Sequence, residues 1–482
     1  MTTRWTGRRS ATRTACGRRA AVVGGAVPVL AISLLAGAVG SPGPGAIAEA
    51  SAEASAEPAS EAVAAATGMA PPPAAAPSGR SAGWRQARPD HAWEFPRAHW
   101  RHPGFKTEWW YFTGHLAEMG DDAGALPRYG FQFTFFRVGL LSQPPRLASA
   151  WAATDLIMGH ASVTDVATGE HVFSEVLYRA VPLLGGFGAP EDSLIAWSRG
   201  PAGTAAPWRL MWTGTGFRIT AADARRGLWL DLVAEPLQPH VFQGPNGYSP
   251  KSAAAAAAAA AGSEAAAGSQ GSEAAPGSGG ADGAESAGGT GGAESVAASL
   301  YYSFPRLAAT GTVAAGGPPR RVRGQCWMDR EIFTSTLAPG QTGWDWLSLQ
   351  LDDGRELMLY RLRDAGGAAD YGLGTLVEAD GTVRRLSLDE WSWTPLGTWR
   401  SPETGAVYPV RWRLQVPSAG LDLELAARVD AQENVSRRAG IFYWEGAVAA
   451  AAMRGSPGGE AATVGLGYVE LTGYGPGSRP PL

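Results

Sequence analysis

Alternating apolar and polar residues dominate the chain from residue 107 onward. Residues 107–116 and 129–138 read TEWWYFTGHL and YGFQFTFFRV, with the two-residue period and aromatic content of β-strands. Further segments of this kind, separated by Gly, Pro and Asp-Gly turns, are 208–220, 228–234, 347–351, 357–362, 410–416, 421–427, 441–448 and 464–471. Only the amino-terminal segment and one alanine run keep a helical period. The pattern predicts an all-β protein of two antiparallel barrels or sandwiches.

The segment 343–363 predicts one hairpin in detail. Its turn, Asp352-Asp353-Gly354, suits a three-residue loop with glycine in the left-handed conformation. The resulting register pairs Leu349 with Leu357, Leu347 with Leu359, Asp345 with Arg361, Ser348 with Met358 and Trp346 with Tyr360. A two-residue turn would mix the faces, which a half-buried strand resists. We therefore predict a structural Asp345–Arg361 pair in the barrel wall, where a guanidinium satisfies a partly buried acid.

A second strand carries acids beside an indole. In the segment CWMDRE, alternation places Trp327, Asp329 and Glu331 on one face, with no obvious partner for either carboxylate there. Two interpretations stay open. If the face is exposed to solvent, the acids serve solubility. If the face lines a cavity, desolvation raises the pKa of a carboxyl and keeps it protonated as a donor.

The amino-terminal segment predicts export. Residues 1–48 contain six arginines and no acid, then an apolar run and a small-x-small cleavage pattern at 46–48. The Arg18-Arg19 pair before the apolar run suggests a twin-arginine signal, with an ordinary export signal or an uncleaved anchor as alternatives. Residues 49–85 are rich in Ala, Pro, Ser and Glu, a composition typical of a disordered tether that could keep the folded part near a membrane. An exported bacterial protein is expected.

A second biased stretch divides the folded part. Residues 252–298 are Ala, Gly, Ser and a few acids without an aromatic residue, which predicts a disordered insert whose opening alanines form helix transiently. The expected domains are therefore 86–251 and 299–478. The net charge is −4 and neither half contains a basic run, so a nucleic-acid partner is not expected.

The chain offers little for metals or cofactors. Cys16 lies in the signal, which leaves Cys326 as the only cysteine of a mature protein, and the histidines fit no common metal-ligand spacing. No phosphate loop, dinucleotide fingerprint or serine-hydrolase elbow follows a strand. We expect neither a metal nor a cofactor.

Eight ordered blocks stand out along the chain: HPGFKTEWWYFTGHL (102–116), FQFTFFR (131–137), YYSFPRL (301–307), WMDRE (327–331), GWDW (343–346), LDDGRELMLY (351–360), YWEGAV (443–448) and GYVELTGY (467–474). Together these blocks resemble the AttH/CrtC family, which includes AttH-like secreted hydrolases and carotenoid 1,2-hydratase (hydroxyneurosporene synthase). The resemblance covers residues 90–476 apart from the insert. It implies two lipocalin-like antiparallel β-barrel domains in tandem.

The resemblance also implies chemistry. The hydratase branch adds water to an isoprenoid double bond without a cofactor, and its proton donor is an aspartate in an aromatic-x-Asp pattern, which Trp327-Met328-Asp329 matches. That branch also uses a histidine ahead of the aspartate. Here all seven histidines lie at or before His240, and Tyr301-Tyr302 stands roughly where that histidine would be. Glu331 and Tyr302 are therefore the expected helpers of Asp329.

Two hypotheses from different classes remain. One is an enzyme that uses Asp329 for acid-initiated hydration, hydrolysis or cyclisation of an apolar, isoprenoid or lipid-like ligand. The other is a lipocalin-type carrier of a hydrophobic small molecule at the cell envelope, which needs a cavity but no acid in it. In both, the residues expected to contact the ligand are Trp109, Trp327, Trp346, Met358 and Tyr360.

Overall fold

A computed structural model describes residues 83–122, 124–146, 149–269, 296–453 and 463–475. All of them belong to the unit Ala76–Leu482. The predicted export segment and residues 49–82 of the predicted tether lie outside the described residues. Arg85, which we assigned to the tether, instead packs on the first barrel, where its backbone N–H donates to Gly104 O at 2.8 Å.

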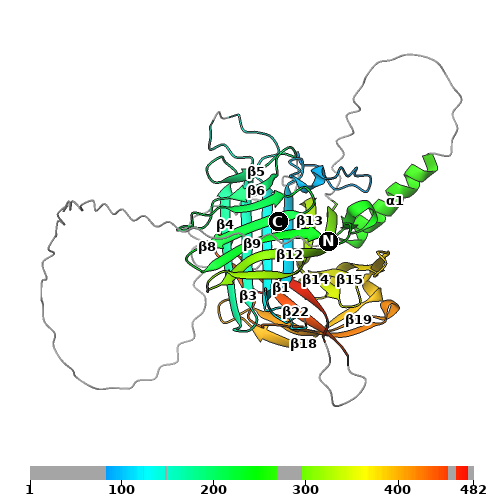
Figure 1. Cartoon of the computed structure of the whole chain (residues 1–482). Coiled ribbons are helices and arrows are strands. Elements are labelled where there is room, and N and C mark those ends of the chain that lie inside the picture. Colours follow the sequence, from blue (N-terminus) through cyan, green and yellow to red (C-terminus); the bar gives the residue numbers. More distant parts are fainter. Residues whose placement is uncertain (1–82, 123, 147–148, 270–295, 454–462, 476–482) are drawn as a thin grey trace, which may run out of the picture. The chain divides into compact units, whose positions relative to one another are not determined.

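Two curled antiparallel sheets form two barrel-like domains in tandem, which confirms the predicted fold class (Figure 1). Within the described residues, the first sheet runs in the order β4-β3-β2-β1-β13-β12-β9-β8-β7-β6-β5, and β10 and β11 pair with β12. Its strands are β1 (Thr107–Glu118), β2 (Tyr129–Gly139), β3 (Asp155–Asp165), β4 (Glu170–Arg179), β5 (Gly185–Phe187), β6 (Leu194–Ser198), β7 (Trp208–Trp212), β8 (Phe217–Asp223), β9 (Leu228–Pro236), β10 (Val241–Phe242), β11 (Tyr248–Pro250), β12 (Ala298–Ala315) and β13 (Arg320–Ser335). The outer strands β4 and β5 contact each other, so the sheet curls nearly closed.

The second sheet runs in the order β17-β16-β15-β14-β23-β22-β20-β19-β18, and β21 pairs with β22. Its strands are β14 (Gln341–Leu351), β15 (Glu356–Asp364), β16 (Ala369–Val377), β17 (Val383–Ser387), β18 (Ser392–Arg400), β19 (Val407–Val416), β20 (Leu421–Ala427), β21 (Glu433–Ser436), β22 (Ile441–Ala452) and β23 (Thr463–Thr472). The segment predicted as strand over 208–220 is instead the two strands β7 and β8, because Gly214, with φ of 100°, makes a turn between them.

Helices are few in the described residues. The alanine run of the predicted insert forms α1 (Ala253–Ser269), so this part is helical rather than disordered, and 270–295 lie outside the description. Short 3-10 helices are η2 (Arg97–His99), η3 (Pro245–Gly247), η4 (Leu388–Glu390) and η5 (Pro417–Ala419). No helix of the described part has the length and hydropathy needed to cross a membrane.

The insert does not separate the two barrels, so the predicted domain boundary was wrong. Strands β12 and β13 follow the insert in the chain, yet both lie in the first sheet, where β13 pairs with β1 along its length. The insert is therefore a connection between β11 and β12 of one barrel, and the second barrel begins with β14. A composition change marks where a chain leaves a sheet, but not which sheet it re-enters.

Each barrel is filled by its own apolar side chains. In the first, alternate residues of β1 and β2 point inward, among them the fully buried Phe112, Phe131 and Phe133. In the second, the leucines of the β14–β15 hairpin meet Trp412 and Trp444. At about 25 cal/mol for each Å² of apolar surface removed from water, these interiors are the main stabilising contribution to the fold.

The predicted hairpin register is confirmed pair for pair. β14 and β15 align Asp345 with Arg361, Trp346 with Tyr360 and Leu347 with Leu359, and Gly354 in the turn has φ of 89°. Arg361 Nε donates to Asp345 Oδ2 at 2.8 Å, and Arg363 Nε donates to Asp345 Oδ1 at 2.9 Å. Asp345 is therefore neutralised by two guanidiniums in the wall of the second barrel.

The first barrel holds a buried ion cluster. Glu108, Arg137 and Arg330 are all fully buried, with Arg137 Nη1 3.2 Å from Glu108 Oε1 and Arg330 bonded to the other oxygen. Burial alone would raise the pKa of Glu108, but the two arginines lower it below its ordinary value. This cluster holds β1, β2 and β13 in register.

The outer faces of the two sheets approach each other closely at one end. A Cβ on Gly130 of β2 would lie 2.7 Å from Tyr468 Oη and 2.8 Å from Ala447 Cβ, both in the second sheet. His115 Nε2 lies 2.8 Å from Gly467 O across the same contact. Glycine at position 130 thus lets the sheets meet at one end, and larger side chains further along β1 and β2 hold them apart.

Candidate active site between the two barrels

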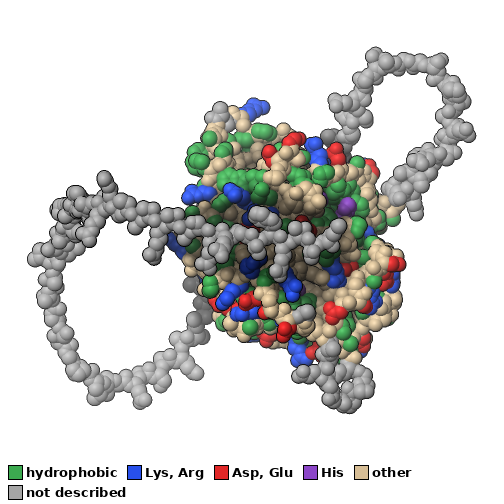
Figure 2. All heavy atoms as spheres, in the orientation of Figure 1, with side chains coloured by type: hydrophobic (Ala, Val, Ile, Leu, Met, Phe, Trp, Pro, Cys, Tyr) green, Lys and Arg blue, Asp and Glu red, His purple; other side chains and the backbone are tan. Residues whose placement is uncertain are grey.

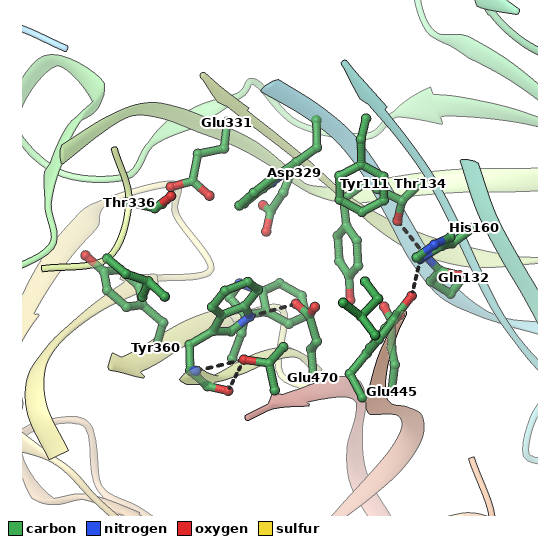
Figure 3. Close-up of a pocket in the computed structure, with 18 of the residues that line it drawn as sticks. Tyr111, Gln132, Thr134, His160, Asp329, Glu331, Thr336, Tyr360, Glu445 and Glu470 are labelled. Atoms are coloured by element: carbon green, nitrogen blue, oxygen red, sulfur yellow. Dashed lines mark hydrogen bonds between the residues drawn. The ribbon is translucent and has the colours of Figure 1, made fainter. Parts of the chain in front are cut away.

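A cavity opens between the two sheets rather than inside either barrel (Figure 3). It contains about 1040 Å³ of space free of protein atoms, part of which is its open mouth. The side chains around it come from β1, β2, β3, β12 and β13 on one wall and from β14, β15, β22 and β23 on the other. Thirteen of the 23 lining residues are aromatic or aliphatic, and ten are polar or charged. An apolar lining with placed polar groups is typical of small-molecule sites. Figure 2 shows one face of the molecule, where charged side chains of both signs lie among hydrophobic side chains.

Asp329 lies on the first wall, on the predicted face of β13. It is 2% exposed and accepts three hydrogen bonds, from Tyr301 Oη at 2.6 Å, Ser303 Oγ at 2.5 Å and Trp327 Nε1 at 2.6 Å. Two of these donors come from β12, which places Ser303 directly opposite Asp329. Trp346 Nε1 of the second sheet donates to Tyr301 Oη at 3.1 Å and extends the chain of bonds across the cavity.

The pKa of Asp329 is raised from its usual value to about 7. Burial is the main cause, and the nearby Glu331 adds to it, while the hydrogen bonds from Ser303, Tyr301 and Trp327 act in the opposite direction. Asp329 can therefore hold or release a proton near neutral pH. The contrast with Asp345 is one of partners: Asp345 has two arginines, whereas only neutral donors bond to Asp329.

Glu331 lies next to Asp329 on the same face and does have a cationic partner. Lys251 Nζ lies 2.7 Å from Glu331 Oε1, in a contact made by charge rather than by a well-aligned hydrogen bond. The same ammonium lies 4.4 Å from the centre of the Tyr360 ring and 5.3 Å from that of Tyr301. Lys251 follows β11 immediately, so this cation lies at the point where the chain leaves the sheet and the insert begins.

The second wall carries two more carboxyls. Glu445 of β22 and Glu470 of β23 are cross-strand partners, and both line the cavity. Trp344 Nε1 donates to Glu470 Oε2 at 3.1 Å, and Asn434 Nδ2 lies 3.3 Å from Glu445 Oε2. Burial first, and then the charge of Glu470, raises the pKa of Glu445 well above its ordinary range. The pKa of Glu470 is raised to about 7, again mainly by burial.

A histidine completes the lining at the far side. His160 of β3 is fully buried, and its Nδ1 lies 2.7 Å from Tyr443 Oη of the second sheet. Burial lowers the pKa of His160 to about 3, so the ring is neutral. Its Nε2 has no hydrogen-bond partner in the described part of the chain. The ring can therefore accept or donate one further hydrogen bond inside the cavity.

Comparison with known proteins identifies the family. The family model described as AttH-like matches residues 86–278 and 272–474, which together span more than half of the chain. The chain belongs to the AttH-like family. No curated protein matches the sequence.

Among the solved structures that resemble this AttH-like protein are one of moderate and one of low sequence identity. A Nitrosomonas europaea protein assigned to AttH is 29% identical, with a TM-score of 0.61 over 81% of this chain and 100% of that chain. Kievitone hydratase from Nectria haematococca is 12% identical, with a TM-score of 0.49 over 79% of this chain and 92% of that chain. The first supports the two-barrel architecture across nearly the whole folded part, and the second is too distant to support an argument.

The AttH-like site brings together most of the residues that the sequence singled out. Asp329, Glu331, Trp109, Trp346 and Tyr360 all line the cavity. Two other predicted contacts do not line it. Trp327 and Met358 are buried in the aromatic cluster behind the cavity, although Trp327 still bonds to Asp329.

The predicted role of Tyr302 was wrong. We expected it to help Asp329, but it points into the first barrel, where its hydroxyl lies 2.7 Å from His99 Nδ1. Its neighbour Tyr301 reaches Asp329 instead. The reason is the strand period: Ser303 faces Asp329 across β12 and β13, so Tyr301 shares that face and Tyr302 does not.

The residues of the AttH-like site that were not predicted as site residues include Lys251, Tyr301, His160, Glu445 and Glu470. For Tyr301 the alternation of β12 relative to β13 could have decided between the two tyrosines. The others come from strands or loops distant in the chain, and no local pattern distinguishes them from ordinary strand residues. Among the described residues, no group of His, Cys, Asp and Glu is arranged to hold a metal ion.

Proposed function

We propose that this AttH-like protein binds an apolar, unsaturated ligand between its two barrels and protonates it with Asp329. The observation that carries the proposal is the state of this carboxyl: it is buried, faces an aromatic cavity, has no basic partner among the described residues and has a pKa of about 7. A general acid works best when its pKa lies near the operating pH. The reaction class is cofactor-free hydration, hydrolysis or cyclisation.

The hydration variant shows how the site would work. The Asp329 O–H bond breaks as a C–H bond forms on the double bond, and the positive charge develops on the neighbouring carbon. Aromatic faces such as those of Trp109 and Trp346 stabilise that charge by up to about 2 kcal/mol for a well-placed ring. Water then adds to the cation and returns a proton to the Asp329 carboxylate, so that the carboxyl is restored.

The hydrogen bonds around Asp329 suit this role. Tyr301, Ser303 and Trp327 all donate toward its oxygens, so they stabilise the carboxylate that remains after proton transfer. They are held by packing before any ligand arrives, and therefore need little reorganisation during the reaction. Glu331 is paired with Lys251, so its proposed role is to favour the protonated form of Asp329 through its nearby charge rather than to act as a second acid.

Two neighbouring tyrosines provide a matched test. Apolar ligands that co-purify with the protein would first be identified by native mass spectrometry, and unsaturated isoprenoids and lipid esters would then be assayed for turnover. Asp329→Asn is expected to lower kcat about 10²- to 10⁴-fold, the usual contribution of a general acid. Tyr301→Phe should lower kcat as well, whereas Tyr302→Phe, on the opposite face of the same strand, should not.

The alternative is a carrier without chemistry, which the same cavity would also serve. Tight binding of a co-purified ligand by wild type and Asp329→Asn alike, with no turnover by either, would favour the carrier. Turnover that is equal in the two proteins would remove Asp329 from the mechanism.

We also propose that the protein is exported by a bacterium to its periplasm, envelope or medium. The proposal rests on the arginine-rich and then apolar residues 1–48. Cell fractionation tests it: replacing Arg18 and Arg19 by Lys should retain the protein in the cytoplasm, and unchanged export would reject the twin-arginine route.

A further inference from the structure

The carboxyl pair of the second wall has no cation of its own. Within the described residues, no Lys or Arg forms an ion pair with Glu445 or Glu470. Glu445 is 1% exposed, and its Oε1 makes no hydrogen bond of ordinary geometry. The Tyr111 hydroxyl nevertheless lies near enough to lower the pKa of Glu445, against the larger effect of burial. Buried acids are normally satisfied by bases or by several donors, because desolvating an unpaired charge is unfavourable. Among the described residues, Glu445 therefore lines the cavity with the neutral Tyr111 hydroxyl and Asn434 amide beside it and with no base.

The lining as a whole is short of positive charge. It contains the four carboxyls Asp329, Glu331, Glu445 and Glu470, one lysine and no arginine. Lys251 is already committed to Glu331. Burial raises the pKa of Asp329, Glu445 and Glu470, so these carboxyls hold protons while no cation lies near them. A ligand that brings a positive charge would favour their ionised form and pair with it, whereas an anionic ligand would oppose their ionisation.

The first wall shows how this cavity holds an ammonium. Lys251 Nζ sits against a carboxylate oxygen at 2.7 Å and over the Tyr360 ring at 4.4 Å. The second wall repeats the carboxylate and the rings without the ammonium. There Trp344 bonds to Glu470 and lies stacked on Trp109, with ring centres 6.4 Å apart and planes inclined by 27°. A cation near such faces gains further attraction from the rings.

We propose that the ligand of this cavity is an apolar molecule with a protonated amine, whose ammonium binds at Glu445 and Glu470 among the surrounding aromatic rings. This inference rests on the cavity of the proposed function, but not on the proton transfer from Asp329. The apolar part of the ligand occupies the aromatic space toward Asp329, and the ammonium supplies the charge that the second wall lacks.

Binding of two matched compounds tests the inference. Geranylamine and geraniol share one unsaturated isoprenoid chain and differ in the charged or neutral end group. Isothermal titration calorimetry with the full chain at about pH 8 should give geranylamine at least about tenfold tighter binding, the effect of one charge-assisted hydrogen bond of about 1.4 kcal/mol. Glu470→Gln, at a half-buried position, should reduce that preference severalfold and leave geraniol binding within about twofold.

Control variants separate this inference from the proposed chemistry. Asp329→Asn should keep the preference for geranylamine even where it abolishes turnover. Glu445→Gln serves as a second variant in case one substitution disturbs folding, which circular dichroism would report. Equal binding of the two compounds, absence of binding by both, or a preference that survives Glu470→Gln and Glu445→Gln together would overturn the inference.

Discussion

The raised pKa of Asp329 predicts that the stability of the protein depends on pH, and this can be measured without a ligand. A carboxyl whose folded pKa lies above its unfolded value is stabilising when protonated, so its contribution is complete below the unfolded pKa and disappears as the pH rises through the folded pKa. For Asp329 the folded value is about 7 and the ordinary value 3.8, so the window runs from about pH 4 to pH 7. Linkage over these values gives a loss of about 2 to 3 kcal/mol in the free energy of unfolding between pH 5 and pH 8.

Asp329→Asn removes this titration and keeps the shape of the side chain. Urea unfolding followed by tryptophan fluorescence at pH 5 and at pH 8 should therefore show a smaller loss of stability for the variant than for wild type, by about 2 kcal/mol. Asp352→Asn is the control, because this side chain is exposed in the β14–β15 turn, and it should follow wild type. Equal losses in wild type and Asp329→Asn would refute a protonated Asp329 at neutral pH, and with it the basis for proton donation.

Three further predictions concern the framework around the site. Asp345→Asn should lower the free energy of unfolding by about 3 kcal/mol in urea titrations, because Arg361 and Arg363 lose a buried counter-charge; a loss below about 1 kcal/mol would contradict the assigned structural role. Lys251→Met should lower the free energy of unfolding by a similar amount. Adding Glu331→Gln should recover part of that loss in a double-mutant cycle, whereas purely additive effects would argue against the Lys251–Glu331 pair. Gly130→Ala should lower stability by about 1 to 3 kcal/mol, since its Cβ would meet Tyr468 and Ala447, and an unchanged melting temperature would mean that the two sheets can separate there at little cost.

Local patterns in the sequence were sufficient for the faces of single strands and for the register of one hairpin. The two-residue alternation predicted that Trp327, Asp329 and Glu331 share a face, and the turn at Gly354 determined which residues pair in the β14–β15 hairpin. These features involve neighbours within one strand or one hairpin, where backbone geometry leaves few choices.

The tertiary structure decided what that face meets. The alternation of apolar and polar residues does not indicate whether a strand face borders solvent, a core or a cavity. The face of Asp329 lines a cavity because the second sheet packs opposite it. The pairing of β12 with β13, which aligns Ser303 with Asp329, determined that Tyr301, not Tyr302, bonds to Asp329. Lys251 and the pair Glu445 and Glu470 reach the site from elsewhere in the chain, because contacts between distant strands are set by how the sheets curl and pack.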